Sequence, residues 1–185
     1  MAQTNTLIED SKMKTNIDLT HFSIRGFRAD EWSDLRDIRL RAVKAHSNLF
    51  LGSYETEAAF PDERWKGIIA LEDGKVFGLY ANGKLIGITG VFPNNHDPSG
   101  LSAKLGMSYI EPAYRGLGLS RLLYEVRLDW ARAYGYERVI VSHRDGNEAS
   151  RRANAAFGFK RFMSEDVTFG DGTTALDHRY ELKFG

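Results

Sequence analysis

The chain reads M-S-Y-I-E-P-A-Y-R-G-L-G-L-S from Met107 to Ser120. An apolar extended segment ends at Pro112, a turn with two glycines follows, and helical spacing of apolar residues begins directly after it. The order is therefore strand, glycine turn, helix. The first backbone N–H groups of such a helix have no partner within the helix, and together with the helix dipole they form a site for an anion, most often a phosphate.

The residues of the turn suit this anion site. Gly116 and Gly118 accept backbone angles that other residues avoid, and they place no side chain between a ligand oxygen and the N–H groups. Arg115 adds a planar, permanently charged partner for phosphate. Two other phosphate-binding loops fit less well, because the chain has no G-x-x-x-x-G-K-[ST] motif and Arg121 stands where a dinucleotide fingerprint needs its third glycine. A purely structural turn is the remaining alternative.

Length and composition indicate one globular domain and exclude several classes of function. The 185 residues are 42% hydrophobic and 27% charged, and 25 basic residues balance 25 acidic ones, so global charge gives no reason to expect a nucleic acid or an anionic membrane as partner. We expect a cytoplasmic protein, since no apolar run reaches the length of a membrane span and no signal-peptide pattern is present. The lack of cysteine excludes disulfides, thiolate zinc sites and an acyl-cysteine intermediate, and the histidines show no metal-ligand spacing.

The pattern predicts a polar tail over residues 1–20 and a single α/β domain over residues 21–185. The expected elements, in order, are a strand over 22–27, helices from Asp30 and from Pro61, a hairpin over 76–92, a strand over 103–110, a helix over 118–134, a strand over 138–142, a helix from Asn147 and a hairpin over 162–184. Residues 46–57 read as an irregular loop. Asn82-Gly83 favours a type I′ turn in the first hairpin.

Two details of the predicted sheet bear on a site. Ala103, Leu105, Met107 and Tyr109 alternate along one strand, and Ile110 breaks the alternation, which predicts a bulge near Tyr109 and Ile110. The order strand, helix, strand over residues 103–142 predicts a parallel strand pair with a right-handed crossover.

The turn R-G-L-G-L-S after I-E-P, the strand V-I-V at 139–141, Asn147 and the pair Gly158-Phe159 resemble the GNAT superfamily of acyl-CoA N-acyltransferases. The element order follows that family from residue 22 to residue 184. The family's turn motif is written [QR]-x-x-G-x-[GA], and the chain departs from it only by serine at position 120. The resemblance implies a mixed, mostly antiparallel sheet with a splayed parallel strand pair, flanked by helices.

The resemblance also implies acetyl-CoA as cosubstrate. The amides of the turn would hold the pyrophosphate of coenzyme A, and the strand before the turn would pair its backbone with the pantetheine arm. The implied cofactor-binding residues are Met107, Ser108, Ile110, Arg115, Gly116, Leu117, Gly118, Leu119, Ser120 and Asn147. A helix terminus contributes about 0.3 to 2 kcal/mol toward an anion, whereas micromolar affinity requires about 8 kcal/mol, so these parts must act together.

The implied reaction is direct transfer of an acetyl group to a primary amine. It needs an unprotonated amine, a donor that polarises the thioester carbonyl and a proton for the departing thiolate. The backbone N–H of Ile110 is the expected donor. Many members carry an acidic tyrosine seven residues after the helix asparagine, a position that Asn154 occupies here. We therefore expect Ser150, three residues after Asn147, to be the acid.

The general base is not assigned by the sequence. Residues 101–110 contain no carboxylate, and Asp97, His96 and Glu111, the nearest candidates, each fit a surface or turn role better. An amine of pKa about 10.4 costs about 4.6 kcal/mol to deprotonate at neutral pH, whereas an α-amine near 8 costs about 1 kcal/mol. A site without a strong base therefore favours an amine of low pKa or a water relay.

The acceptor class stays open between polyamines or antibiotics, amino acids, and protein N-termini. We expect the loop over 46–57 and the turn over 169–174 to select it. Two other functions are alternatives: a catalytically silent module that binds or senses acyl-CoA, and a nucleotide-binding protein that uses the turn for another phosphate. A homodimer through the last hairpin is also expected.

Overall fold

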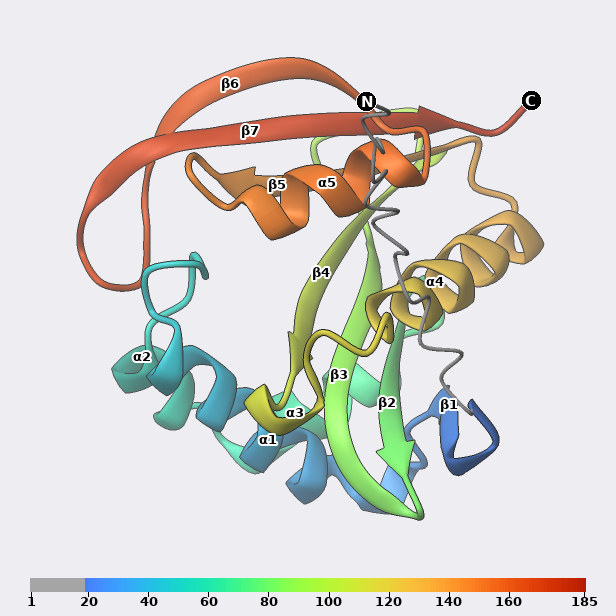
Figure 1. The fold of residues 1–185 in the computed structure, drawn as a ribbon, viewed down its shortest axis with the longest axis vertical. Coiled ribbons are helices and arrows are strands. Elements are labelled where there is room, and N and C mark those ends of the chain that lie inside the picture. The colour runs from blue at the N-terminus through green and yellow to red at the C-terminus, as the bar shows by residue number, and fades with distance from the viewer. Residues whose placement is uncertain (1–18) are drawn as a thin grey trace, which may run out of the picture.

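The computed structural model describes residues 19–185, and Figure 1 names its elements. The strands are β1 (Phe22–Gly26), β2 (Lys75–Ala81), β3 (Lys84–Pro93), β4 (Ser102–Ile110), β5 (Arg138–Arg144), β6 (Lys160–Thr168) and β7 (Thr174–Lys183). The α-helices are α1 (Trp32–Ala45), α2 (Tyr54–Ala58), α3 (Asp62–Ile69), α4 (Ser120–Tyr134) and α5 (Glu148–Ala156). Most of the expected tail lies outside the described residues, and Leu19 and Thr20 begin a short 3-10 turn, Leu19–His21.

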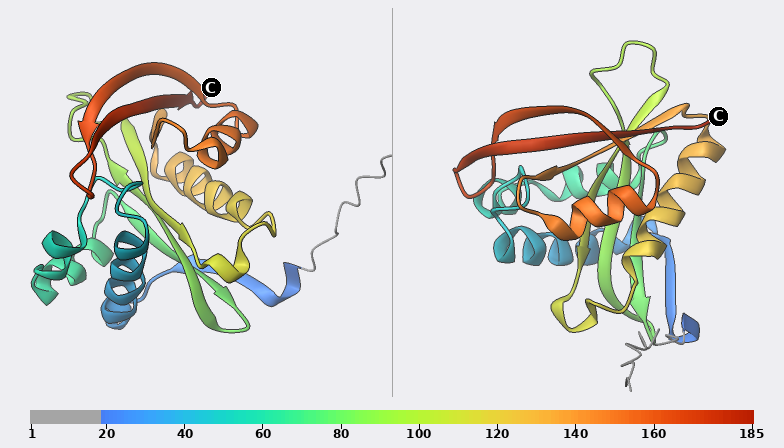
Figure 2. Two further views of the ribbon diagram at one scale, coloured as in Figure 1. Left: turned by 60° about the vertical axis from the view of Figure 1, so that its left-hand side comes forward. Right: turned by 45° about the horizontal axis from the view of Figure 1, so that its top comes forward.

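Within residues 19–185, the strands form one seven-stranded sheet in the order β1-β2-β3-β4-β5-β7-β6. Each neighbouring pair is antiparallel except β4 and β5, which are parallel. Helices α1, α2 and α3 cover one face of the sheet, and α4 and α5 cover the other, as the left view of Figure 2 shows. The predicted α/β fold with a mixed, mostly antiparallel sheet is confirmed.

The parallel pair separates after a short contact. Ser102, Ala103 and Lys104 pair with residues 138–140, and the two strands make no further ladder contact. The C-terminal half of β4 therefore presents an open backbone edge toward β5. The predicted splayed pair is confirmed, and its closed end lies at the start of both strands.

A bulge interrupts β4 earlier than the sequence predicted. Gly106 lies opposite Gly90 and Tyr109 opposite Ile88, so Met107 and Ser108 together oppose the single residue between those partners. Met107 has a φ of 56°, unusual for a residue with a side chain. A bulge in this strand is thus confirmed, but two residues before the predicted position at Tyr109 and Ile110, because a positive φ at a methionine leaves no signal in the residue pattern.

The bulge changes the face to which the side chains of β4 point. Ala103 and Leu105 lie in the core under α4, whereas Met107 and Tyr109 pack in the core under α1. Because side chains alternate along a strand, Lys104 also points to the α1 face, and Ser108 points to the α4 face. The predicted single face for all four apolar residues was therefore wrong.

Three local predictions have clear outcomes. Asn82 and Gly83 have φ of 48° and 81°, which confirms the type I′ turn. Asp30 lies in a 3-10 turn, and Glu31 rather than Asp30 precedes α1. Helix α2 occupies part of the expected irregular loop, where Ser53 caps it by accepting a 3.2 Å hydrogen bond from the backbone N–H of Thr56.

Candidate active site

The glycine turn has the properties of an anion site. Gly116 and Gly118 have φ of 78° and 71°, and an added Cβ at either would meet no atom within 4 Å. Within residues 19–185, no backbone N–H from residue 116 to residue 120 donates a hydrogen bond to a described partner. Leu119 anchors the turn, since its side chain is 1% exposed and packs with Leu79 and Leu123. The packing of Leu119 thus fixes the turn on the core, while the backbone N–H groups of the turn stay free to bind a ligand.

Arg115 braces the turn against β4 and α1. Its Nε donates to the carbonyl of Ile110 at 2.8 Å, and its Nη2 lies 2.8 Å from Nε2 of His46. An arginine only donates, so Nε2 of His46 accepts and the ring is neutral. Burial, followed by the charge of Arg115, lowers the pKa of His46 in agreement with this state. The sequence did not single out His46.

The N–H of Ile110 points into the gap between β4 and β5. The backbone N–H of Glu111 donates to Ile86 on β3 at 2.8 Å. Hydrogen-bonded and non-bonded residues alternate along an antiparallel pair, so Ile110, which lies opposite Gly87, directs its backbone groups away from β3. The bond from Arg115 to its carbonyl fits this direction.

A cavity of about 850 Å³ lies where the two strands separate. It takes lining residues from both faces of the sheet, so it joins the α4 and α5 side to the α1 side. Of the residues predicted for the site, the cavity is lined by Met107, Ser108, Ile110, Arg115, Ser120, Asn147 and Ser150. Gly116, Leu117, Gly118 and Leu119 lie in the adjoining turn and do not line it.

Asn147 and Ser150 meet at the start of α5. Oδ1 of Asn147 accepts a 3.2 Å hydrogen bond from the backbone N–H of Ser150, so the asparagine caps the helix. The hydroxyl of Ser150 has no hydrogen-bond partner among residues 19–185 and borders the cavity. A serine that only bonded its own helix would not show this geometry.

Tyr124 on α4 brings a tyrosine hydroxyl to the position where the sequence has Asn154. The hydroxyl donates to Oδ1 of Asn154 at 2.5 Å, and the ring stacks on Phe157 with centroids 4.6 Å apart. Burial raises the pKa of Tyr124. Asn154 is fully buried, and its Nδ2 has no hydrogen-bond partner among residues 19–185. No pattern in the sequence indicates Tyr124, because its hydroxyl reaches this position from α4 rather than from α5.

Arg127 lies one helical turn further along α4, beneath the bulge. Its Nε donates to the carbonyl of Leu123 at 2.8 Å and its Nη1 to Oγ of Ser108 at 2.9 Å, while Ser108 also bonds Thr89 at 2.9 Å. Burial lowers the pKa of Arg127 to about 10. The signal in the sequence for this residue is an arginine on the apolar face of α4, between Leu123 and Ala131.

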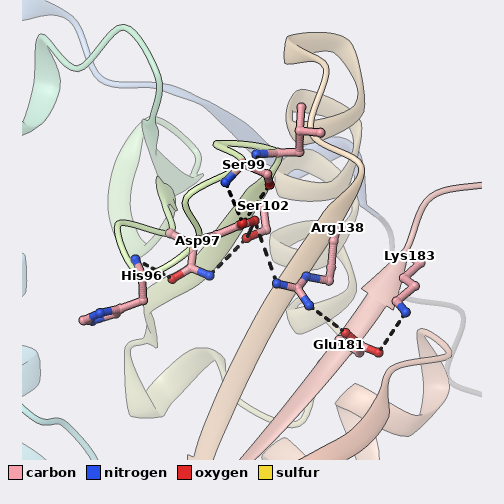
Figure 3. Close-up of polar contacts among 9 residues, drawn as sticks. His96, Asp97, Ser99, Ser102, Arg138, Glu181 and Lys183 are labelled. Atoms are coloured by element: carbon pink, nitrogen blue, oxygen red, sulfur yellow. Dashed lines mark hydrogen bonds and ion pairs between the residues drawn. The ribbon is translucent and has the colours of Figure 1, made fainter.

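The three candidate bases differ in position. Asp97 accepts hydrogen bonds from the hydroxyls of Ser102 at 2.5 Å and Ser99 at 2.7 Å, which lower its pKa, and it lies 3.8 Å from Arg138 (Figure 3). It therefore fastens the loop after β3 to β5. Glu111 pairs with an arginine of α1 at 3.1 Å and does not line the cavity.

Only His96 of the three borders the cavity, and its ring points away from the Asp97 cluster in Figure 3. Across residues 19–185, no group of three or more His, Cys, Asp or Glu side chains is placed to hold a metal ion. In the same part of the chain, none of the helices has the length and apolar character needed to cross a membrane.

The family model described as the acetyltransferase (GNAT) family matches residues 32–159. The chain belongs to the GNAT acetyltransferase family. This membership makes it an acyl-CoA-dependent acetyltransferase and confirms the resemblance inferred from residues 110–159. A search of curated protein sequences gave no match.

Solved structures of other acetyltransferases share this GNAT fold. The protein yncA of Salmonella typhimurium, solved with its cofactor acetyl-CoA, has a TM-score of 0.75 at 19% identity, with 89% of this chain and 95% of that chain covered. A GNAT acetyltransferase of Streptococcus pneumoniae gives 0.76 at 19% identity, covering 89% and 99%. A ribosomal-protein-alanine N-acetyltransferase of Brucella melitensis gives 0.72 at 18% identity, covering 88% and 99%.

Proposed function

We propose that this acetyltransferase moves an acetyl group from acetyl-CoA directly to a primary amine. One observation carries the proposal: a single cavity joins the open edge of β4 and the free turn amides, on the α4 side, to a chamber on the α1 side. Two substrates can therefore approach one point from opposite faces of the sheet. A covalent intermediate is not needed when both can meet there.

The residues around the turn fit coenzyme A. The N–H groups of residues 116–120 suit a pyrophosphate, and they extend the N-terminus of α4, a helix of 15 residues. The unpaired edge of Met107 to Ile110 suits the amide groups of the pantetheine arm, as an added strand would. Asn147 approaches from α5 with its Nδ2 unpaired among the described residues. When bound, the thioester supplies the activated acetyl carbon.

The proposed catalytic groups are Ile110 and Ser150. The N–H of Ile110 points into the gap, where it can donate to the thioester oxygen as negative charge develops. The free hydroxyl of Ser150 can give a proton to the departing thiolate. Tyr124 is the weaker choice for this acid, because its proton already lies in a 2.5 Å bond to Asn154.

Release of free thiol from acetyl-CoA, measured with a panel of amines, tests the proposal. Amine-dependent thiol release with formation of an acetamide is the expected result. Binding of acetyl-CoA without thiol release from any amine would instead identify a silent acyl-CoA-binding module. Binding of NAD in preference to coenzyme A, measured by calorimetry, would favour the nucleotide-binding alternative. The homodimer and the cytoplasmic location stay predictions.

A further inference from the structure

The charged side chains that line the cavity are mostly cations, although the chain is neutral overall. Among residues 19–185, they are six cations and one carboxylate, Asp177. The cations are Arg39, Lys104, Arg115, Arg127, Arg138 and Arg179. Arg115 and Arg127 contact the turn and the bulge, beside the proposed coenzyme. The other four surround the α1 side, where an acceptor would enter.

Three of these four cations already have carboxylate partners. Arg39 pairs with Glu57 at 2.6 Å, and Arg138 pairs with Glu181 at 3.3 Å (Figure 3). Arg179 contacts Glu165, and its Nε lies 3.5 Å from Asp177. The one acidic group of the cavity is thus already engaged.

Lys104 is the exception on this side. Within residues 19–185, no carboxylate lies within ion-pair distance of the Lys104 ammonium, and the ammonium donates no hydrogen bond. The side chain is partly buried, and burial together with the nearby charge of Arg179 lowers its pKa. A partly buried cation without a counter-ion is costly unless a ligand supplies the missing negative charge.

Lys104 lies close enough to the proposed reaction site for an acceptor substrate to supply its counter-ion. Lys104 pairs with Ile140 at the last contact of β4 with β5, so it stands where the cavity opens. It shares the α1 face with Gly106, two residues away, which corresponds to about 6.8 Å along the strand. The bulge follows at Met107 and Ser108, and Ile110 lies six residues from Lys104. The side chain of Lys104 and a thioester bound at Ile110 would both extend into this interval, so a small acceptor between them could have its amine at the thioester and its anion on Lys104.

The uncompensated charge of Lys104 also acts on the amine. A nearby positive charge favours the neutral form of an amine over the ammonium form, which supplies part of what a general base would do. It also opposes the entry of a polycation. An acceptor with one amine and one anionic group satisfies both conditions.

We propose that the acceptor is a small amine that carries a carboxylate close to the amine, as a free α-amino acid does, and that Lys104 binds this carboxylate. The proposal rests on the proposed acetyl transfer and names its acceptor class. Of the three classes left open by the sequence, it selects amino acids over polyamines and protein N-termini.

Thiol release and acceptor binding, measured on the wild-type protein and three variants, test this. The acceptors are a set of α-amino acids, the carboxamides of the same amino acids, a Ser-Ala-Ala peptide and spermidine. Lys104→Met removes the charge, Lys104→Arg retains it, and Lys84→Met removes an exposed charge at the tip of the β2–β3 hairpin as the matched control. Calorimetry with the coenzyme A complex measures binding of the amino acids without turnover.

We expect kcat/KM for amino acids to exceed that for their carboxamides by at least about tenfold, or about 1.4 kcal/mol. Lys104→Met should bring this ratio near one by raising KM for the acid, Lys104→Arg should restore part of it, and Lys84→Met should leave it unchanged. The carboxamide has the less basic amine, so a preference for the acid cannot arise from amine pKa.

The failures of the two proposals are distinguishable. Equal or better use of carboxamides, the peptide or spermidine would overturn the acceptor class and leave acetyl transfer supported. A ratio that Lys104→Met does not change would overturn the role of Lys104. Lys104-dependent binding of amino acids without any thiol release would overturn acetyl transfer but support the ligand class. If amino acids do not bind and no amine causes thiol release, both proposals are overturned.

Discussion

Nη1 of Arg127 donates a 2.9 Å hydrogen bond to Oγ of Ser108 and thereby joins the middle of α4 to the bulge of β4. Arg127 is 1% exposed, and no carboxylate among residues 19–185 pairs with it. A buried charge without an ion pair lowers stability, so its presence at the bulge indicates a role in the site rather than in the fold.

Arg127→Met should separate stability from activity. Replacing an unpaired buried cation by an apolar side chain of similar length should leave the free energy of unfolding unchanged or raise it by about 1 to 3 kcal/mol. Turnover of acetyl-CoA should fall, because Ser108 and the bulge lose their support. Chemical denaturation and thiol release measure the two effects, with the exposed Arg132→Met on the same helix as control. A destabilised variant with full activity would show that Arg127 serves only the fold.

Ser150→Ala tests the proposed acid. Loss of a general acid typically lowers kcat by about 10² to 10⁴-fold. Stability should not change, since the hydroxyl has no hydrogen-bond partner in the described part of the chain. Ser33→Ala, at the start of α1 and away from the cavity, is the matched control. An unchanged kcat and pH profile in Ser150→Ala would remove Ser150 from the mechanism.

Glu31 should make the fold sensitive to acid. Two hydrogen bonds of 2.7 Å from Arg25, together with the backbone N–H of Arg28, lower the pKa of Glu31 from 4.5 to about 2. Because the folded pKa is below the unfolded one, the stabilisation is fully present above about pH 4.5 and is lost as the pH falls toward 2.

Glu31→Gln should therefore lower the free energy of unfolding at pH 7 by about 1 to 2 kcal/mol, which is less than the whole pKa shift implies because solvent screens the partly exposed Arg25. The variant should also lose less stability than the wild type between pH 4.5 and 2. Denaturation at a series of pH values checks both statements, with exposed Glu137→Gln as control. Parallel curves for wild type and Glu31→Gln would contradict them.

The sequence predicted best what depends on neighbouring residues. Gly116, Gly118 and the Asn82-Gly83 turn follow from backbone angles that glycine and asparagine adopt, and the order of helices and strands along the chain follows from local periodicity. It predicted a bulge in this strand but not its position at Met107 and Ser108, because nothing about a methionine favours a positive φ.

Contacts between residues that are far apart in the chain could not be predicted from the sequence either. Tyr124 reaches Asn154 across 30 positions, and Lys104 becomes part of the site only because β4 and β5 separate beside it. Neither relationship has a spacing that could be recognised in advance. The candidate site was therefore predicted along the strand and turn, and was incomplete wherever a second element contributes.

The bare amides beside Gly116 and Gly118 should bind the diphosphate of acetyl-CoA. Calorimetric titration of acetyl-CoA into Gly116→Val, Gly118→Val and Gly83→Val measures this contribution. All three glycines have a positive φ and open space at the Cβ position, so the backbone strain is comparable, and Gly83 lies on a distant hairpin. We predict that affinity falls at least about tenfold, or about 1.4 kcal/mol, in the first two variants and stays at the wild-type value in the third. Wild-type affinity in Gly116→Val and Gly118→Val would show that the diphosphate is not bound at this turn.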